Sequence, residues 1–349
     1  MPFKHTTTAS ILLILLSTSF VSALNITVYQ ANVAFAPLPL PYSHADSDGD
    51  DIIALFQNLG RNTVWKSIAN ISFEGDTFEP EGIVRLGPDR YIVSAGQWTE
   101  PTVPYNATIN GTDRSTGAGF SHLIVFDGEG SRIADATITR RGDIEYHNGG
   151  IDFDGKYLWG TIAQYRPNST AYVYKARPET LEPEPILHYN DHLGGVVHDV
   201  QTDRITALNW GSRNASTWDL DDINDEYRAS STSEYTEPPE KIVRNPSHFI
   251  DYQDCKFLGH SKHYQNRPVM LCGGIAAIGS GDDAFYLGGI ALVDVTTMLP
   301  LGEVPIALRS ALGIPLTVNP IEASVENGKL RLYLLPDQNH STLYIMEAQ

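Results

Sequence analysis

One short pattern of residues returns five times along this chain and limits what the chain can fold into. Each copy has a glycine or small residue, an apolar pair, a polar turn and a second apolar run, which is typical of two antiparallel strands. A third apolar run follows every copy, and a fourth follows each of the first four. Four antiparallel strands repeated about every 50 residues predict an all-β fold, a β-propeller of five four-stranded blades. The copies span residues 79–98, 147–165, 192–211, 252–275 and 320–338.

The fifth copy has no outer strand of its own after its third apolar run. A spare strand pattern at residues 63–73 precedes the first copy. We therefore expect this N-terminal strand to complete the last blade, because closing the ring removes an exposed sheet edge. Six blades are an alternative if residues 24–60 contribute strands, and an open β-sandwich is a second alternative.

The residues before the propeller form two further segments. Residues 1–23 combine an early lysine, an apolar stretch and a small-residue end, a pattern that predicts a secretory signal peptide and a secreted, extracellular protein. Residues 24–62 are rich in proline and then in aspartate. They predict an extended N-terminal arm with a solvated acidic stretch and a short helix within residues 51–60. The propeller domain is expected to span residues 63–349.

Two features of the sequence agree with export to an oxidising compartment. Cys255 and Cys272 flank a polar loop, and a hairpin centred near His263 and Tyr264 would pair them in a disulfide worth about 3 kcal/mol. Two buried free thiols are the alternative. Sequons of the Asn-x-Ser/Thr type predict N-glycosylation. They begin at Asn25, Asn70, Asn106, Asn110, Asn168, Asn214 and Asn339.

The formal net charge of −18 limits the partners of the protein. A surface this acidic repels nucleic acid and anionic lipid. The chain has no run after the leader that is long and apolar enough to span a membrane, so we expect no membrane insertion. We also expect a monomer. It has no nucleophile-elbow motif, no zinc-protease motif and no glycine-rich phosphate loop, so no nucleotide cofactor is expected. A small-molecule ligand or a cation fits this composition better.

Propeller geometry brings distant residues to one mouth of the central channel. The residues that open each inner strand form rings there, and the loops after the second strands reach the same end. We therefore predict a pocket with His147, His192 and Glu81 as candidate catalytic residues. Carboxylate and amide oxygens suit Ca²⁺ and histidines suit transition metals, so a divalent cation of either kind is expected. The candidate metal ligands are Glu81, Asn148, Asp254 and Glu322, and the candidate substrate-binding residues are Trp98, Gln164, Arg166, Trp210 and Arg213.

These residues are compatible with two classes of function. A metal-assisted hydrolase of the lactonase type, or an isomerase, would polarise a carbonyl or activate water, and arginines would clamp a substrate carboxylate. A small organic molecule such as a fungal secondary-metabolite intermediate would suit an exported enzyme. The alternative is a non-catalytic propeller that binds a sugar or a protein, with the channel carboxylates in structural use.

Several phrases of the sequence resemble an uncharacterised family of exported bacterial and fungal propeller-like proteins. These phrases are HNGGIDFDG, YRPNS, GGVVHD and WGSR, and the resemblance covers most of residues 75–346. It implies common ancestry but no established reaction. The phrase PEGI at residues 80–83 is more loosely similar to the first channel strand of calcium-dependent propeller lactonases and the strictosidine synthase-like group, which implies that Glu81 binds metal. Those families usually have six blades, and glycines stand here at two of the later ligand positions.

Overall fold

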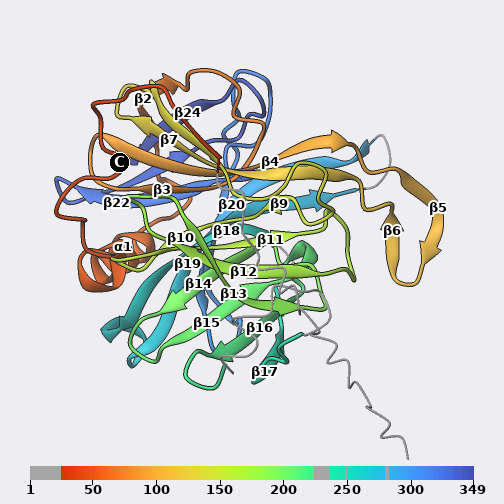
Figure 1. The fold of residues 1–349 in the computed structure, drawn as a ribbon. Coiled ribbons are helices and arrows are strands. Elements are labelled where there is room, and N and C mark those ends of the chain that lie inside the picture. The colour runs from red at the N-terminus through yellow and green to blue at the C-terminus, as the bar shows by residue number, and fades with distance from the viewer. Residues whose placement is uncertain (1–24, 224–235, 248–249, 280–282) are drawn as a thin grey trace, which may run out of the picture.

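A computed structural model describes residues 25–223, 236–247, 250–279 and 283–349 of the chain. These residues form five antiparallel sheets whose inner strands contact one another in a closed ring (Figure 1). The predicted five-bladed all-β propeller is therefore confirmed. The predicted signal peptide at residues 1–23 lies outside the described residues. Neither the length nor the hydropathy of any described helix is sufficient for a membrane crossing.

Each blade is built from consecutive strands that run from the channel to the outer edge. Blade 1 contains β3 (Glu79–Arg85), β4 (Arg90–Glu100), β7 (Ala118–Asp127) and β8 (Arg132–Thr137). Blade 2 contains a split inner strand, β9 (His147–Asn148) and β10 (Asp152–Phe153), and then β11 (Leu158–Ala163), β12 (Ala171–Ala176) and β13 (Pro183–Tyr189). Blade 3 contains β14 (Gly195–Asp199), β15 (Arg204–Leu208), β16 (Asn214–Asp219) and β17 (Lys241–Arg244). Blade 4 contains β18 (Asp251–Ser261), β19 (Arg267–Ile278), β20 (Phe285–Asp294) and β21 (Pro300–Ile306).

Blade 5 shows how the ring closes. Its three inner strands come from the end of the chain, β22 (Ile321–Glu326), β23 (Lys329–Leu334) and β24 (Thr342–Ala348). Its outer strand is β2 (Trp65–Ser72), which pairs antiparallel with β24 from Trp65 opposite Ala348 to Ser72 opposite Thr342. The expectation that residues 63–73 complete the last blade is thus confirmed. The first and last strands of the propeller pair with each other, which closes the ring.

The N-terminal arm is packed against the propeller more closely than its sequence indicates. Strand β1 (Asn25–Val28) pairs with β8 and adds a fifth strand to blade 1, rather than starting a sixth blade. A short 3-10 turn, η1 (His44–Asp46), leads into helix α1 (Gly49–Gln57), near the helix predicted within residues 51–60. The buried face of α1, which includes Ile53 and Phe56, packs into the core of blades 4 and 5.

Three further elements lie in the connections between strands. A separate hairpin, β5 (Pro104–Ile109) and β6 (Thr112–Arg114), is inserted between β4 and β7 and has no counterpart in the predicted pattern. The turn η2 (Trp210–Ser212) follows β15, and η3 (Lys262–Tyr264) joins β18 to β19. Figure 1 shows the β5–β6 hairpin and helix α1 on opposite sides of the molecule.

The disulfide between Cys255 and Cys272 is confirmed. The two residues are directly opposite each other on β18 and β19, and both are buried. The hairpin turns at η3, which contains the two residues on which the predicted hairpin is centred. The bridge therefore joins the two inner strands of blade 4.

Glycines allow the inner strands to meet at the channel axis. A Cβ atom on Gly82 of blade 1 would lie 2.4 Å from the backbone nitrogen of Ile151 in blade 2. A Cβ atom on Gly149 would lie 2.3 Å from the carbonyl oxygen of Gly194 in blade 3. Any larger residue at these positions would push neighbouring blades apart, so the glycines in the repeated phrase serve close backbone approach.

An ion pair in the middle of the channel joins four of the five blades. The Lys256 ammonium group of blade 4 donates to both Asp254 carboxylate oxygens, at 2.9 Å each, and to the carbonyl of Ile151 in blade 2. Asp254 also accepts from the backbone nitrogens of Ile83 in blade 1, at 3.4 Å, and Ile321 in blade 5, at 3.0 Å. Both charged side chains are almost fully buried. We call this pair the axial ion pair.

Removing the cation of the axial ion pair should destabilise the whole propeller. Lys256→Met leaves the Asp254 carboxylate buried without its cation, so the free energy of unfolding should fall by about 3–5 kcal/mol. The double variant Asp254→Asn with Lys256→Met removes both charges and keeps an oxygen acceptor, so it should recover most of the loss. Urea unfolding of the three proteins measures both effects. Unchanged stability in Lys256→Met would show that the pair does not join the blades.

Candidate functional site

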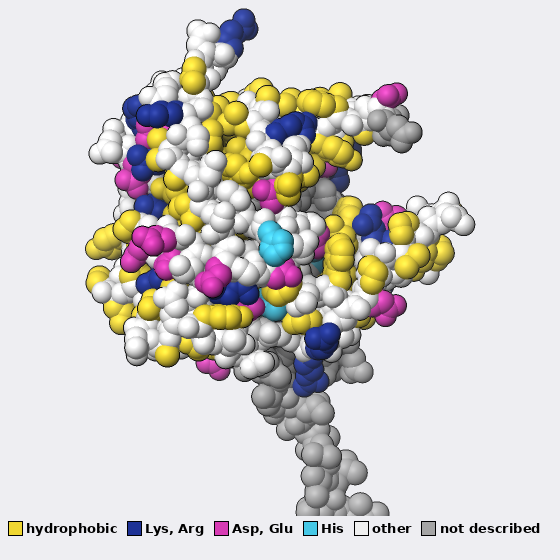
Figure 2. All heavy atoms as spheres, turned by 90° about the horizontal axis from the view of Figure 1, so that it is seen from above, with side chains coloured by type: hydrophobic (Ala, Val, Ile, Leu, Met, Phe, Trp, Pro, Cys, Tyr) yellow, Lys and Arg dark blue, Asp and Glu magenta, His cyan; other side chains and the backbone are white. Residues whose placement is uncertain are grey.

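A cavity of about 650 Å³ lies at one mouth of the channel, on the side of the β5–β6 hairpin. In Figure 2 this hairpin and the tips of β19 and β20 project on the right, with a hollow between them. The cavity wall contains histidines, carboxylates, aromatic rings and an amide from the inner strands and their connecting loops. These residues are Glu79, Glu81, His147, Tyr165, His192, Trp210, Asp251, Tyr252, Asp337 and Gln338.

Two of the carboxylates come from the first strand of the propeller. Glu79 and Glu81 lie two residues apart on β3, and a carboxylate oxygen of each lies within 4.8 Å of the other. The pairing with β4 shifts register between Pro80 and Gly82, which places Glu81 in a β-bulge. Bulges re-aim side chains near functional sites. Both glutamates are buried.

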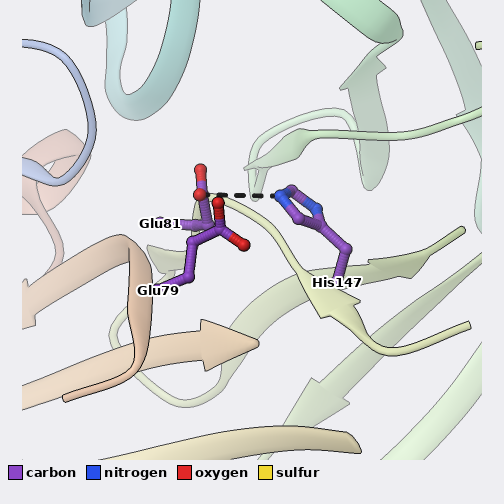
Figure 3. Close-up of side chains that lie close together, drawn as sticks. All are labelled: Glu79, Glu81 and His147. Atoms are coloured by element: carbon purple, nitrogen blue, oxygen red, sulfur yellow. Dashed lines mark ion pairs between the residues drawn. The ribbon is translucent and has the colours of Figure 1, made fainter. Parts of the chain in front are cut away.

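His147 approaches the same point from blade 2. It begins β9, which pairs with the end of β11 through Ala163. Its Nε2 atom lies 3.6 Å from Oε1 of Glu81, as the dashed line in Figure 3 shows. One ligand atom from each of Glu79, Glu81 and His147 lies within 4.8 Å of the others. A single divalent cation can therefore contact all three residues, which we call the Glu–Glu–His group.

The Glu–Glu–His group is only partly hydrogen-bonded. Gln338 donates to Oε1 of Glu79 at 3.2 Å, and Asn319 donates to Oε1 of Glu81 at 3.4 Å. Burial and the neighbouring Glu81 carboxylate raise the pKa of Glu79 to about 7. Burial alone would lower the pKa of His147, but Glu81 and then Glu79 outweigh it and raise that pKa. Among the described residues, Oε2 of Glu79 and Nδ1 of His147 are buried without a hydrogen-bond partner. Such atoms are rare in folded proteins unless they meet a ligand, a water or an ion.

His192 lies beside this group in a different protonation state. Its Nδ1 donates to the carbonyl oxygen of Gln164 at 2.8 Å, which leaves Nε2 with a free electron pair. Burial, and then the neighbouring His147, lower its pKa to about 3, so the ring is neutral at physiological pH. A histidine held by a backbone carbonyl in this way has the orientation typical of metal-ligating histidines. The two histidine rings are 5.4 Å apart, centroid to centroid.

Aromatic rings form one wall of the cavity. Tyr165 lies 4.9 Å from the ring of His147 and 5.5 Å from the ring of Trp210. Trp210 in turn packs edge-on against His192 at 4.8 Å. The guanidinium of Arg114, at the end of β6, lies 4.9 Å from the centroid of the Trp210 ring. The inserted hairpin therefore reaches from blade 1 to the residues of blades 2 and 3 that line the cavity.

The predicted substrate-binding residues are only partly at this cavity. Trp210 lines it, and Trp98 is exposed nearby with its ring 6.1 Å from that of Tyr165. The Gln164 side chain is buried and bonds to Thr170, while Arg166 donates to Gln164. Arg213 forms an ion pair with Asp251 at the rim.

The four predicted metal ligands do not converge. Glu81 belongs to the Glu–Glu–His group, but Asn148 donates to the carbonyl of His122 and accepts from the hydroxyl of Tyr174. Asp254 belongs to the axial ion pair, and Glu322 pairs with His44 at 2.8 Å. The sequence pattern aligned these residues along equivalent strands, but they lie at different depths and the deeper carboxylates have cationic partners from the chain itself. The described residues whose ligand atoms lie close enough together to share one cation are instead Glu79, Glu81 and His147.

The carboxylates occupy three successive levels along the channel. The upper level is the Glu–Glu–His group, next to the cavity. The middle level is Asp254, which accepts from the backbone at Ile83, and the lower level is Glu322, which accepts from the backbone at Arg85. Both oxygens of Asp254 and of Glu322 have donors. The upper level is the one of these three whose hydrogen bonding is incomplete among the described residues.

The N-terminal arm closes the channel at the lower level. His44 donates from one ring nitrogen to Glu322 at 2.8 Å, and its other ring nitrogen lies 2.6 Å from Asp48. Asp48 also accepts from the backbone nitrogen of Val325 in blade 5. The acidic stretch of the arm is thus bonded to the propeller at Asp48, in contrast to the expected solvated linker. The upper cavity opens at the other end of the channel.

Three features of the site were missed by sequence reasoning. The start of the first inner strand places Glu79 at the channel mouth, but its grouping with Glu81 and His147 was not expected. Arg114 lies on the hairpin inserted between β4 and β7, outside the repeated pattern. Lys256 follows Asp254 by two residues on β18. Because residues two apart share one face of a strand, this spacing could have indicated an ion pair between them.

The fold and the site define a five-bladed propeller with a mixed carboxylate and histidine cavity at one channel mouth. The chain belongs to a family of unknown function, DUF6454, whose family model matches residues 42–349. No curated protein shows significant sequence similarity to it.

Two solved structures resemble the chain at 9% sequence identity. One is the tail fiber of Staphylococcus aureus phage P68, with a TM-score of 0.42 over 85% of this chain, and the chain spans 55% of that protein's length. The other is the WD40 domain from Toxoplasma gondii coronin, with a TM-score of 0.33 over 83% of this chain and 87% of that one.

The arm contact should make stability depend on pH through His44. Burial alone would lower the pKa of His44, but Glu322 and Asp48 outweigh it and raise it from 6.5 to about 10. A raised folded-state pKa stabilises the fold fully below the unfolded-state value and loses that contribution as pH rises through the folded-state value. Wild type should therefore exceed His44→Gln in stability most at pH 6, and the difference should shrink between pH 6.5 and about 10.

Denaturant unfolding across this pH range measures the difference, with His263→Gln as the control because His263 is exposed on η3. The control should show a small, pH-independent difference from wild type. A constant difference for His44→Gln across the range would contradict a protonated His44 in the arm contact.

Proposed function

We propose that this protein is a divalent-metal-dependent hydrolase that acts on a small molecule in the upper cavity. The observation that carries the proposal is the incomplete partnering of the Glu–Glu–His group, in contrast to the two deeper carboxylate levels. Two buried carboxylates beside one histidine favour a cation, because each carboxylate disfavours the charge on the other. The three residues offer oxygen and nitrogen atoms that suit several divalent ions.

When bound, such an ion would act as a Lewis acid toward a carbonyl and lower the pKa of a coordinated water. Glu79, Glu81 and His147 would hold it at the cavity floor. His192 would accept a hydrogen bond at Nε2 from water or substrate and orient it, because a pKa of about 3 makes the ring a weak base. The rings of Tyr165 and Trp210 would restrict water and pack against the bound molecule.

A non-catalytic binding propeller is the second candidate, and the aromatic wall favours it. Tyr165, Trp210 and the exposed Trp98 form a continuous set of rings beside the cavity. Such rings also bind sugars or other ligands without any chemistry. The two candidates differ in whether the Glu–Glu–His group binds metal and supports turnover.

Metal binding should depend on the glutamates of the upper level. Purified protein should contain about one divalent ion per chain by mass spectrometry of metals, and chelation should lower its melting temperature. Glu79→Gln and Glu81→Gln should lose the ion and the metal-dependent part of the stability. Turnover of a panel of small esters, lactones and amides should disappear with the ion.

Asp251→Asn is the matched control for this experiment. Asp251 lines the same cavity but lies outside the Glu–Glu–His group, and it is half exposed. This variant should retain the ion. If wild type binds none of Ca²⁺, Mn²⁺ or Zn²⁺, or if both glutamine variants keep the ion, the metal-dependent hydrolase is wrong. A ligand bound without turnover in metal-loaded protein would favour the binding propeller.

We also propose that the protein is exported and N-glycosylated. The buried disulfide and the positions of the sequons support this proposal. Six sequon asparagines are exposed, and Asn214 is half-buried at the start of β16.

Treatment of the protein from its native host with an N-glycosidase should lower its mass. Peptide mapping should find glycans among the six exposed sites and leave Asn214 unmodified, because a glycan must project into solvent. A protein whose mass does not change, or that carries its glycan on Asn214, would contradict the proposal.

A further inference from the structure

We infer that the protein groups lining the upper cavity favour a neutral molecule with a large apolar part over carboxylates and phosphates. This inference deepens the proposed function and rests on it only for what happens to the molecule after binding. Three observations support it. The arginines near the mouth bond to groups of the protein, carboxylates line the cavity, and one wall is aliphatic and exposed.

The arginines around the mouth donate hydrogen bonds to other groups of the protein. Arg114 donates twice to the neighbouring Asp113, at 2.9 and 3.0 Å. Arg213 binds Asp251 and two backbone carbonyls. Arg309 donates to the carbonyls of Gly313 and Tyr286, at 2.6 Å each. Of the two arginines that the sequence predicts as a clamp for a substrate carboxylate, Arg213 is paired with Asp251, and neither Arg166 nor Arg213 lines the cavity.

Carboxylates are the most numerous charged groups in the cavity lining, beside His147, whose pKa is raised. Four carboxylates line it, those of Glu79, Glu81, Asp251 and Asp337, and none of its described lining residues is lysine or arginine. A concave site with one sign of charge concentrates that potential and repels ligands of the same sign. An anionic ligand would therefore enter against the field of the site, whereas a neutral one would not.

The wall opposite the aromatic rings is aliphatic. Leu312 and Ile314 lie in the loop between β21 and β22, and Ile275 and Val318 continue the surface inward. Leu312 is 71% exposed. The turn is ordered by the Ser310 hydroxyl, which donates to Asp337 at 2.6 Å, and by Gly313, whose φ of +81° favours glycine.

This geometry gives a bound molecule one orientation. Its apolar part lies between the Leu312–Ile314 turn and the ring of Trp210, and its polar group faces the Glu–Glu–His group and His192. Covering Leu312 removes apolar surface from water, which favours binding in proportion to the area covered. Specificity against anions follows from the repulsive carboxylates and the absence of a free arginine donor among the described lining residues.

A matched pair of ligands tests the inference. Methyl octanoate and octanoate have the same chain and differ in charge, and their binding is measured by calorimetry on chelator-treated wild type, so that no metal attracts the carboxylate. Methyl octanoate should bind at least about tenfold more tightly than octanoate. Leu312→Asp should weaken binding of the ester by about tenfold or more.

Leu299→Asp is the matched control, because Leu299 is 52% exposed in the connection between β20 and β21 and does not line the cavity. It should bind the ester as wild type does. Octanoate binding as tightly as the ester, or Leu312→Asp binding the ester unchanged, would overturn the inference. Tight ester binding without turnover in the metal-loaded protein would support the inference and contradict the hydrolase.

Discussion

The convergence of five inner strands on one axis is the constraint on which the rest of this structure depends. Backbones from different blades approach one another there so closely that glycine is required at Gly82 and Gly149. Polar side chains on these strands are then buried, and each must find its partners within the channel. The axial ion pair of Asp254 and Lys256 meets this requirement for the middle of the channel and at the same time connects four blades.

The same requirement is met differently at the two ends of the channel. At the lower level, the arm supplies His44 to Glu322, and helix α1 covers the neighbouring core of blades 4 and 5. At the upper level, Glu79 and Glu81 face one histidine and an open cavity. Lys256 and His44 thus pair with the carboxylates of the middle and lower levels. At the upper level, Oε2 of Glu79 has no hydrogen-bond partner among the described residues.

The blade architecture could be predicted from the sequence because its evidence is local and repeated. Each copy of the strand pattern carries its own turn residues and glycines, and the spare strand at residues 63–73 could pair only by closing the ring. The pairing of Cys255 with Cys272 followed from a single hairpin. His147, His192 and Glu81 could be placed at one mouth because each lies at or near the start of an inner strand.

What the sequence could not predict depends on contacts between segments that have no shared pattern. Strand β1, the contact of His44 with Glu322 and the position of Arg114 over Trp210 all join an insertion or an arm to a distant blade. The depth of Asp254 and Glu322 in the channel depends on the tilt and stagger of strands, which residue types do not encode locally. The four predicted metal ligands therefore lie at different levels of the channel and not around one point.

A crystal structure grown with Mn²⁺ and analysed by anomalous diffraction tests the central claim most directly. The account predicts one strong peak bounded by the carboxylates of Glu79 and Glu81 and by the imidazole of His147, at coordination distances of about 2.0–2.3 Å. It predicts no peak beside Asp254, where the Lys256 ammonium group already lies. A peak at the middle or lower level, or an empty upper level at saturating Mn²⁺, would contradict it.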